Sequence, residues 1–364
     1  MLSGYNEQAT DDLKILLNTT KSTKSTYSLV NKAMGLVQQG ANPNTQDNQG
    51  NSFLAFLINL NGSCAYSTII DELVIAYQAK LILADVNPAY LIDSRQIQLI
   101  DNLGIGSYST VSLGISKEKQ VAVKLMDTKK HTFSSMLDNY CNEVKLLSKL
   151  APENSPYIIR FLGYDPLKYN FVMEYTTSDS LFHYIKMHTE DTPDWGFCYR
   201  LAKEVASGLD FIHTRKILHR DIKCENILVD ANGPAKIIDF GFSTMKQKYY
   251  DVVGTSDYWG PEVFGGKYSE KSDIFSLGIL LWESTNNRFI HTSRPDFDDP
   301  ELFDYLITEN RPAIAEKCPP KLAHLITWCQ KTKPEQRPKA ADVLEILEGD
   351  IDTVITPSIS PNSV

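Results

Sequence analysis

The spacing of apolar residues changes near position 95 of the chain. Before this position, short apolar runs are interrupted by turns rich in Gly and Asn, such as Gly40–Asn44, which predicts short helices joined by tight turns. After it, apolar and polar residues alternate, which predicts three successive antiparallel strands. These strands are expected at about 97–103, 111–115 and 121–123. The sequence therefore predicts a helical domain over residues 1–92 and a different domain over residues 95–349.

The second domain changes from strands to helices along its length. A helix is expected over Ser135–Leu150, because its leucines and valine fall on one helical face. Beyond Leu181 the pattern is mainly helical. Between these regions, two further strands are expected near Ile158–Leu162 and Asn170–Glu174. The Pro- and Ser-rich residues 350–364 are predicted to form a flexible tail. The fold class is therefore α+β, after an all-α region.

Composition narrows the classes of partner. The 364 residues are 42% hydrophobic, which is enough for one large core or two moderate ones. The net charge of −9 argues against binding to nucleic acid or an anionic membrane, because clustered Lys and Arg neutralise phosphate groups. No secretory signal, membrane-length apolar run or Cys-x-x-Cys pair is found in the sequence. We therefore expect a cytoplasmic protein that binds small molecules or proteins.

The helical region contains a recognisable helix–turn–helix pattern. Residues Gly40–Leu57 resemble an ankyrin repeat with a hairpin tip at Asp47–Gly50, and residues 83–87 resemble the end of a second repeat. The usual T-P-L-H-x-A string is replaced by Ser52–Leu57, without the Pro and the His. One or two repeats cannot bury a continuous core alone. Residues 1–92 therefore either cap the following domain or recruit a protein partner.

Two glycines, Gly104 and Gly106, fall at the turn between the first two predicted strands. Residues without a Cβ let backbone amides approach phosphate oxygens, although hairpin turns also use glycine. A loop between two strands argues against dinucleotide binding, which uses a loop between a strand and a helix. The residues after this turn are more specific. In order they are Lys124 in Val-Ala-Val-Lys, Glu143 on a helix, His219–Asn226, Asp239–Gly241 and Gly260–Glu262.

Together these strings closely resemble the eukaryotic protein kinase family, over residues 95–349. The resemblance implies a bilobal fold, with a β-rich small lobe and a helical large lobe. It also implies transfer of the γ-phosphoryl group of Mg-ATP to a protein hydroxyl. The His-Arg-Asp-x-Lys form resembles Ser/Thr kinases more than tyrosine kinases. Tyr258 and Trp259 resemble the tyrosine-kinase-like branch of the Ser/Thr kinases, and dual specificity stays open.

The resemblance assigns roles to five catalytic residues. Phosphoryl transfer demands positioning and charge compensation rather than covalent chemistry. Lys124 would bridge the α- and β-phosphates, and Glu143 would pair with it. Asp221 would orient the acceptor hydroxyl and take its proton. Lys223 would neutralise the migrating phosphoryl group, and Thr255 would brace both of these side chains.

Metal binding and the architecture of the site are implied by the same resemblance. Asn226 and Asp239 would bind Mg²⁺, or Mn²⁺ in its place, because amide and carboxylate oxygens are suitable ligands for such hard cations. Asp273 would steady the segment that carries the catalytic residues, and Glu262 would pair with Arg337.

The resemblance implies that the ATP site is formed by the glycine turn, the strands around it and the segment after the fifth strand. Met173 would limit access to a back pocket. The family's third loop glycine is replaced by Ser109, which suggests a modestly raised KM for ATP, and its usual Ala before Pro-Glu is Gly260. The implied nucleotide-binding residues are Leu103, Gly104, Ile105, Gly106, Ser107, Tyr108, Ser109, Val111, Ala122, Lys124, Met173, Glu174, Tyr175, Thr176, Ser180 and Leu228.

Other functions remain open at this point. A kinase preceded by ankyrin repeats resembles integrin-linked kinase, which is used largely as a scaffold. The chain could therefore be a pseudokinase, a kinase-like protein without catalytic activity. Pseudokinases typically lack the strand lysine, the catalytic Asp or the metal-binding Asp, but Lys124, Asp221, Asn226 and Asp239 are all present here, which favours catalysis. A small-molecule kinase is disfavoured by the stretch 254–262, which shapes a peptide groove in protein kinases. The same layout occurs in eukaryotic proteins and in proteins that bacteria inject into a host cytoplasm.

Arg220 suggests control by phosphorylation, because a phosphate on the segment 239–262 could pair with this cation. The candidate acceptors are Ser243, Thr244, Tyr249, Tyr250 and Ser256.

Overall fold

The computed structural model describes residues 85–349 apart from short gaps, together with residues 8, 11, 12, 14 and 83. The gaps are 107–108, 128–132, 167, 190–191, 231–232, 246–251, 294, 296 and 309. Two compact units are present: residues 1–86 with 165–169, and residues 87–164 with 170–364. The ankyrin-like segment Gly40–Leu57 and the tail 350–364 lie outside the described residues.

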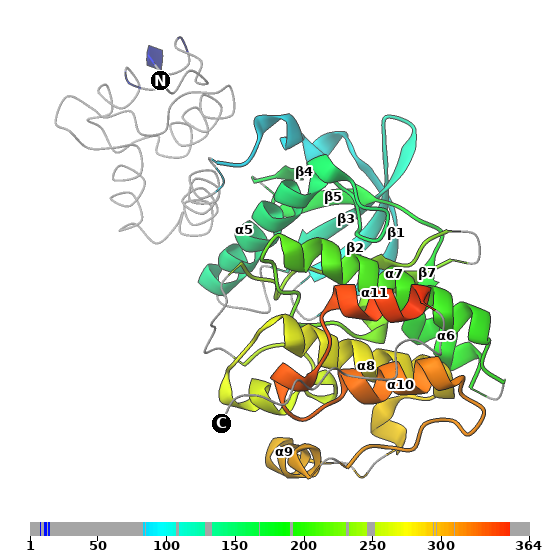
Figure 1. Ribbon diagram of the computed structural model, residues 1–364. Coiled ribbons are helices and arrows are strands. Elements are labelled where there is room, and N and C mark those ends of the chain that lie inside the picture. The colour runs from blue at the N-terminus through cyan, green and yellow to red at the C-terminus, as the bar shows by residue number, and fades with distance from the viewer. Residues whose placement is uncertain are drawn as a thin grey trace. The chain divides into compact units, whose positions relative to one another are not determined.

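The second unit begins with a five-stranded sheet in the order β1-β2-β3-β5-β4 (Figure 1). The first three strands pair antiparallel, as predicted. The fourth strand begins at Phe161 rather than near Ile158, because Ile158 forms an isolated bridge with Ile237 of the other lobe. Val121, Val123 and Val172 form the core of this sheet. The strands are β1 Gln98–Ile105, β2 Ser109–Ser116, β3 Lys119–Met126, β4 Phe161–Asp165 and β5 Asn170–Glu174.

Helix α5, Phe133–Leu150, packs against this sheet and begins two residues before the predicted start. Its buried residues recur at helical spacing, which gives one apolar face. The Tyr140 ring on this face lies 6.4 Å from the Phe171 ring of β5. The buried face comprises Met136, Leu137, Tyr140, Val144, Leu147 and Leu150. Packing of α5 on the sheet places Glu143 beside β3, where Lys124 lies.

The rest of the unit is mainly helical, as predicted, with a small sheet in the order β6-β7-β8. Helix α8 is buried from Ser272 to Thr285 and packs against α7 and α10. A capping box formed by Ser269 and Ser272 defines its first turn. The elements are β6 Asp179–Ser180, α6 Leu181–Met187, α7 Trp195–Thr214, β7 Ile227–Val229, β8 Lys236–Ile237, α8 Glu270–Asn286, α9 Asp299–Ile307, α10 Pro320–Cys329 and α11 Ala340–Glu348.

Short 3-10 helices connect several of these elements. They comprise Pro88–Tyr90, Ser94–Gln96, Ala151–Glu153, Cys224–Asn226, Ser256–Tyr258, Pro261–Gly265, Ile290–Ser293 and Pro334–Gln336. None of the helices in the described part of the chain is long and apolar enough to cross a membrane.

Candidate active site

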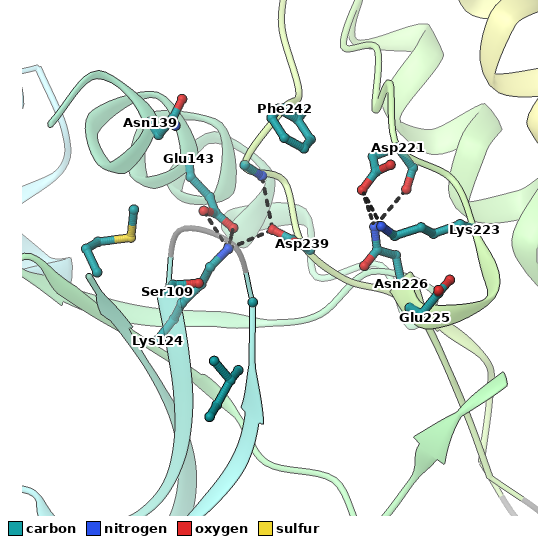
Figure 2. Close-up of a pocket in the computed structure, with 14 residues that line it drawn as sticks. Ser109, Lys124, Asn139, Glu143, Asp221, Lys223, Glu225, Asn226, Asp239 and Phe242 are labelled. Atoms are coloured by element: carbon teal, nitrogen blue, oxygen red, sulfur yellow. Dashed lines mark hydrogen bonds and ion pairs between the residues drawn. The ribbon is translucent and has the colours of Figure 1, made fainter. Parts of the chain in front are cut away.

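A cavity of about 290 Å³ is lined by residues from both lobes. Figure 2 shows its polar side chains in two groups, with Lys124, Glu143 and Asp239 in one and Asp221, Lys223 and Asn226 in the other. The lining residues are Ile105, Gly106, Ser109, Lys124, Met126, Asn139, Glu143, Asp221, Lys223, Glu225, Asn226, Asp239, Gly241 and Phe242. Most of the predicted catalytic and metal-binding residues therefore come together at one place.

The first group is a charge cluster centred on Lys124 of β3. Its Nζ lies 2.8 Å from both carboxylate oxygens of Glu143 and 2.7 Å from Oδ1 of Asp239. Lys124 and Glu143 are buried, with 7% and 1% exposure. A buried ammonium group requires partners of opposite charge. The predicted pairing of Lys124 with Glu143 is thus present, and Asp239 joins it.

The charges of this cluster follow from its geometry. Burial would lower the pKa of Lys124, but Asp239 and Glu143 together raise it above its ordinary value. Loss of solvation would raise the pKa of Asp239, but the Lys124 ammonium group outweighs this effect and holds the pKa at about 2. Burial raises the pKa of Glu143 to about 7, although Lys124 opposes this shift. Lys124 and Asp239 therefore form a charged pair at neutral pH.

The second group surrounds Asp221. Its Oδ2 accepts a hydrogen bond from Nδ2 of Asn226 at 2.9 Å, and its Oδ1 accepts one from the Thr255 hydroxyl at 2.9 Å. Lys223 Nζ donates to the same hydroxyl at 2.9 Å and lies 3.2 Å from Asp221 Oδ2. The predicted bracing of Asp221 and Lys223 by Thr255 is present in this arrangement. One carboxylate is thus held by fixed donors on both of its oxygens.

Asp273 of α8 supports residues 219–226, the predicted catalytic loop. Its carboxylate accepts hydrogen bonds from the backbone N–H groups of His219 at 2.9 Å and Arg220 at 2.8 Å. His213 Nε2 lies 2.8 Å from the same carboxylate. Burial would raise the pKa of Asp273, but the contacts with His213 and His219 lower it. These contacts agree with the prediction that Asp273 steadies the segment 219–226.

Two residues of the site have strained backbones. Arg220 and Asp239 adopt φ values of 68° and 61°, which non-glycine residues seldom use. Arg220 is held in place, because its N–H is bonded to Asp273 and its Nε donates to Phe242 O at 2.5 Å. Asp239 is held by its bond to Lys124. Such strain at functional sites is maintained by the surrounding structure.

Glu262 and Arg337 form the predicted ion pair at the end of the segment 239–262. The two guanidinium NH groups lie 2.6 and 2.8 Å from the carboxylate oxygens. Arg337 is only 2% exposed and also donates to backbone carbonyls of the helical lobe. The pair therefore anchors the segment to the large lobe rather than contacting the cavity.

Only some of the predicted nucleotide-binding residues line the cavity. Ile105, Gly106, Ser109 and Lys124 do so. Ala122 lies opposite Met173 in the sheet, and Ser180 lies opposite Leu228. The remaining positions lie on β1, on β2, at the end of β5 and in the segment after it, at Leu103, Gly104, Val111, Glu174, Tyr175 and Thr176. Ser107 and Tyr108 lie outside the described residues. Contact of this set with ATP stays a prediction.

The predicted metal-binding pair, Asn226 and Asp239, carries oxygens of the kind that Mg²⁺ prefers. Gly104 of the predicted glycine turn lies instead in β1, opposite Val111. A Cβ on Gly104 would meet no described atom within 4 Å, so protein packing does not require glycine there. Asn226 and Asp239 line the same cavity, and the Asn226 amide nitrogen is already used by Asp221. No group of three or more His, Cys, Asp or Glu side chains suited to a metal occurs among the described residues. Two protein oxygens completed by phosphate and water are the usual ligand set of Mg²⁺.

Some contacts near the cavity have no signal in the sequence. Asn142 Nδ2 donates to Ser243 O at 2.7 Å, and the Phe240 N–H donates to Glu143 Oε1 at 3.1 Å. These two bonds connect α5 to the residues after Asp239. Other lining residues that we did not predict are Met126, Asn139, Glu225, Gly241 and Phe242. Gly241 and Glu225 stand inside the strings 239–241 and 219–226 quoted above, so their place in the sequence was a usable signal, whereas no local pattern marks Met126, Asn139 or Phe242.

A buried polar cluster next to the catalytic loop was also missed. Glu283 accepts hydrogen bonds from the Tyr258 hydroxyl at 2.5 Å and from the Cys224 thiol at 2.9 Å. The backbone N–H of Ile290 donates to its other oxygen at 2.9 Å. The cluster thus links the catalytic loop, the segment after Thr255 and α8.

Comparison with known proteins identifies the family. The model of the family described as protein kinase domain matches residues 97–346. The probable serine/threonine-protein kinase drkB of Dictyostelium discoideum is 34% identical over 266 residues, which cover 71% of this chain and 37% of drkB. The dual specificity protein kinase shkD of the same organism is 33% identical over 262 residues, which cover 69% of this chain and 34% of shkD.

The alignment with a plant relative covers a larger share of that relative's length than the alignments with drkB and shkD do. The serine/threonine/tyrosine-protein kinase HT1 of Arabidopsis thaliana is 29% identical over 269 residues, which cover 70% of this chain and 67% of HT1. Several other relatives are much longer, and the chain spans between 12% and 40% of the length of four Dictyostelium kinases that it matches. Because the family match covers well over half of its residues, the chain belongs to the protein kinase domain family.

Proposed function

We propose that this chain transfers the γ-phosphoryl group of Mg-ATP to Ser or Thr hydroxyls of protein substrates. The observation that carries the proposal is the arrangement of Asp221, whose carboxylate is held by Asn226 and Thr255 beside Lys223. This group shares a cavity with Lys124 and its carboxylate partners. A base, a phosphate-binding cation and oxygen ligands for a metal are the parts that phosphoryl transfer requires.

In the proposed reaction, the acceptor oxygen bonds to the γ-phosphorus while the bond from this phosphorus to the bridging oxygen of ADP breaks. Asp221 orients the acceptor hydroxyl and accepts its proton. Lys223 places a positive charge 3.2 Å from Asp221, where it stabilises charge on the transferred group. Lys124 binds the α- and β-phosphates. Mg²⁺ held by Asn226 and Asp239 would neutralise the phosphate oxygens.

The Ser/Thr preference rests on two supports. Lys223 donates to Thr255, which in turn donates to Asp221, and this lysine belongs to the His-Arg-Asp-x-Lys form that resembles Ser/Thr kinases. The relatives drkB, shkD and HT1 are named as serine/threonine or dual specificity kinases. We propose Ser and Thr as the main acceptors, with Tyr as a further acceptor to be tested.

The test is phosphate transfer from Mg-ATP to a panel of Ser, Thr and Tyr peptides by the wild type and by Asp221→Asn. Transfer to Ser and Thr that is lost in Asp221→Asn, but kept in the control variant Asp210→Asn, supports the proposal. ATP binding without transfer by the wild type would instead favour a pseudokinase scaffold. Chelation of divalent cations should abolish transfer, and added Mg²⁺ or Mn²⁺ should restore it.

Regulation by phosphorylation is a further part of this proposal. Ser243 and Thr244 are 0% and 5% exposed, and Thr244 pairs with Leu218 through two backbone hydrogen bonds. A kinase cannot reach buried hydroxyls without opening this segment. We therefore propose Ser256, together with Tyr249 and Tyr250, which lie outside the described residues, as the acceptors. Mass mapping of residues 239–262 after incubation with Mg-ATP tests this, and an unmodified peptide contradicts it.

Residues 1–92 and the location of the protein extend the proposal. We propose that the ankyrin-like region binds a protein partner and that the chain acts in the cytoplasm. Affinity capture with and without residues 1–82 tests the first part. A partner retained equally by both chains would contradict it.

A further inference from the structure

Tyr268 makes an unusual contact with the end of the segment 239–262. Its hydroxyl accepts a hydrogen bond from the backbone N–H of Val253 at 2.8 Å and donates one to the Val253 carbonyl at 2.6 Å. The tyrosine is only 4% exposed. Both backbone groups of one residue are therefore fixed by a single buried hydroxyl.

The position of Val253 determines the path of the next two residues. Gly254 adopts φ of 95°, and a Cβ there would lie 2.4 Å from the carbonyl oxygen of Arg220. The segment thus touches the catalytic loop at a point where only glycine fits. The next residue, Thr255, donates to Asp221 Oδ1 at 2.9 Å. The tyrosine-bound backbone therefore lies two positions before the hydroxyl that orients the catalytic carboxylate.

The ring of Tyr268 contacts the catalytic loop from the same side. The guanidinium carbon of Arg220 lies 5.3 Å from the ring centroid, a distance at which a cation is attracted to an aromatic face. The ring also packs with Leu218 and Val263 in a buried apolar cluster. Tyr268 therefore touches the segment before Thr255, the catalytic loop and the residues after Glu262.

We propose that Tyr268 is a positioning residue for the phosphoryl-transfer reaction. Its hydroxyl fixes the backbone at Val253, so that Thr255 meets Asp221 in the orientation that proton transfer requires. Tyr268 is not among the residues that line the cavity, so it acts through Thr255. This inference rests on the proposed kinase function.

The experiment compares Tyr268→Phe with the wild type in single-turnover transfer to the best Ser or Thr peptide. The variant keeps the ring and loses only the hydroxyl. The hydroxyl makes two hydrogen bonds, and we expect a roughly five- to tenfold slower transfer, an effect as large as the net contribution of one of them. The KM for ATP should not change, because Lys124 lies on the opposite lobe. Tyr140→Phe is the matched control, since it removes a buried hydroxyl that donates to Asn170 O in the small lobe.

A double variant separates positioning from simple stabilisation. If the tyrosine acts through Thr255, then Tyr268→Phe causes no further slowing in a Thr255→Val background. The inference is overturned if the rate losses of the two single variants multiply in the double variant. It is also overturned if Tyr268→Phe lowers the Tm but leaves the transfer rate unchanged, because Tyr268 would then only contribute to packing.

Hydrogen exchange gives a readout that does not need activity. The Val253 amide is bonded to the tyrosine hydroxyl, so exchange in residues 252–258 should accelerate in Tyr268→Phe but not in Tyr140→Phe. Unchanged exchange would contradict the inference. Absence of transfer by the wild type would overturn the proposed function instead, and the exchange result would still report whether the hydroxyl holds the segment.

Discussion

Lys124 is buried but keeps its charge because two carboxylates face its ammonium group. Asp239 holds its own charge firmly, with a pKa of about 2. Glu143 differs, because it is almost completely buried and its position depends on α5. The charge on Lys124 therefore depends mainly on Asp239, whereas its position depends mainly on Glu143.

The Glu143→Gln variant tests this division of roles. Glutamine keeps the shape of the side chain but weakens both contacts with the ammonium group. At pH 8 we expect the KM for ATP to rise roughly ten- to a hundredfold, because a charge-assisted hydrogen bond contributes about 1.5–3 kcal/mol. Steady-state kinetics beside the exposed-site variant Glu118→Gln provide the measurement. An unchanged KM would mean that Glu143 does not orient Lys124.

Glu283 shows how burial changes the pH dependence of stability. Burial raises its pKa from 4.5 to about 7, although hydrogen bonds from Cys224 and Tyr258 oppose the shift. Between these values the folded protein keeps a proton that the unfolded chain releases. Its contribution to the free energy of unfolding therefore decreases as pH rises from about 4.5 to 7.

The Glu283→Gln variant removes this titration. We expect its stability relative to the wild type to improve between pH 5 and pH 8, by roughly 3 kcal/mol at most, since one pKa unit corresponds to about 1.4 kcal/mol. Urea unfolding of both proteins at the two pH values measures the difference. A difference that does not vary with pH would show that Glu283 ionises at its ordinary pKa.

At the scale of elements, helix α5 must be held against the large lobe to keep Glu143 in place. Two hydrogen bonds hold it there. The Asn142 side chain donates to the Ser243 carbonyl oxygen, and the Phe240 N–H donates to the Glu143 carboxylate. Ser243 is itself fixed, because its hydroxyl donates to His219 O at 3.2 Å. The position of α5 is thereby connected to the catalytic loop through the residues that follow Asp239.

Asn142→Ala should loosen α5 without removing any group from the cavity. We expect kcat/KM for ATP to fall roughly fivefold, the effect of one lost hydrogen bond. The exposed residue Lys145 on the same helix provides the control variant Lys145→Gln. Hydrogen exchange across α5 should accelerate only in Asn142→Ala. Equal kinetics for both variants would indicate that α5 is held by its apolar face alone.

Elements with a local signal were predicted well, and those set by distant contacts were not. Strands β1 to β3 follow an alternating pattern, and α5 follows a helical one, so their positions agree with the prediction to within a few residues. Strand β4 begins three residues later than expected, because Ile158 pairs with Ile237 instead of joining the sheet. The segment from Ile158 to Leu162, which is apolar except for Arg160, gives no sign of this long-range bridge.

The same distinction applies to the site across the whole molecule. Lys124, Asp221 and Asp239 occur in short strings typical of protein kinases, so the sequence alone predicted that they would share one site, and all three line the same cavity. Asn142 and Tyr268 act through partners that lie 101 and 15 residues away, and no string contains either pair. The charge cluster and the braced carboxylate were predictable, whereas the contacts that hold them in place required the structure.

The site is assembled entirely within the second unit. The cavity-lining residues lie between Ile105 and Phe242, and the supporting ion pair joins Glu262 to Arg337. Since a compact unit with its own core can fold alone, we expect a chain that begins at residue 83 to transfer phosphate within about threefold of the full rate.

This truncation distinguishes a catalytic domain from one that depends on the first 82 residues. The peptide assay should be repeated with the truncated chain and with its Asp221→Asn variant, after thermal unfolding has shown that both are folded. If the truncated chain transfers phosphate and its Asp221→Asn variant does not, the activity of the truncated chain depends on the Asp221 carboxylate. A folded truncated chain that is more than about tenfold slower would instead show that residues 1–82 complete or activate the site.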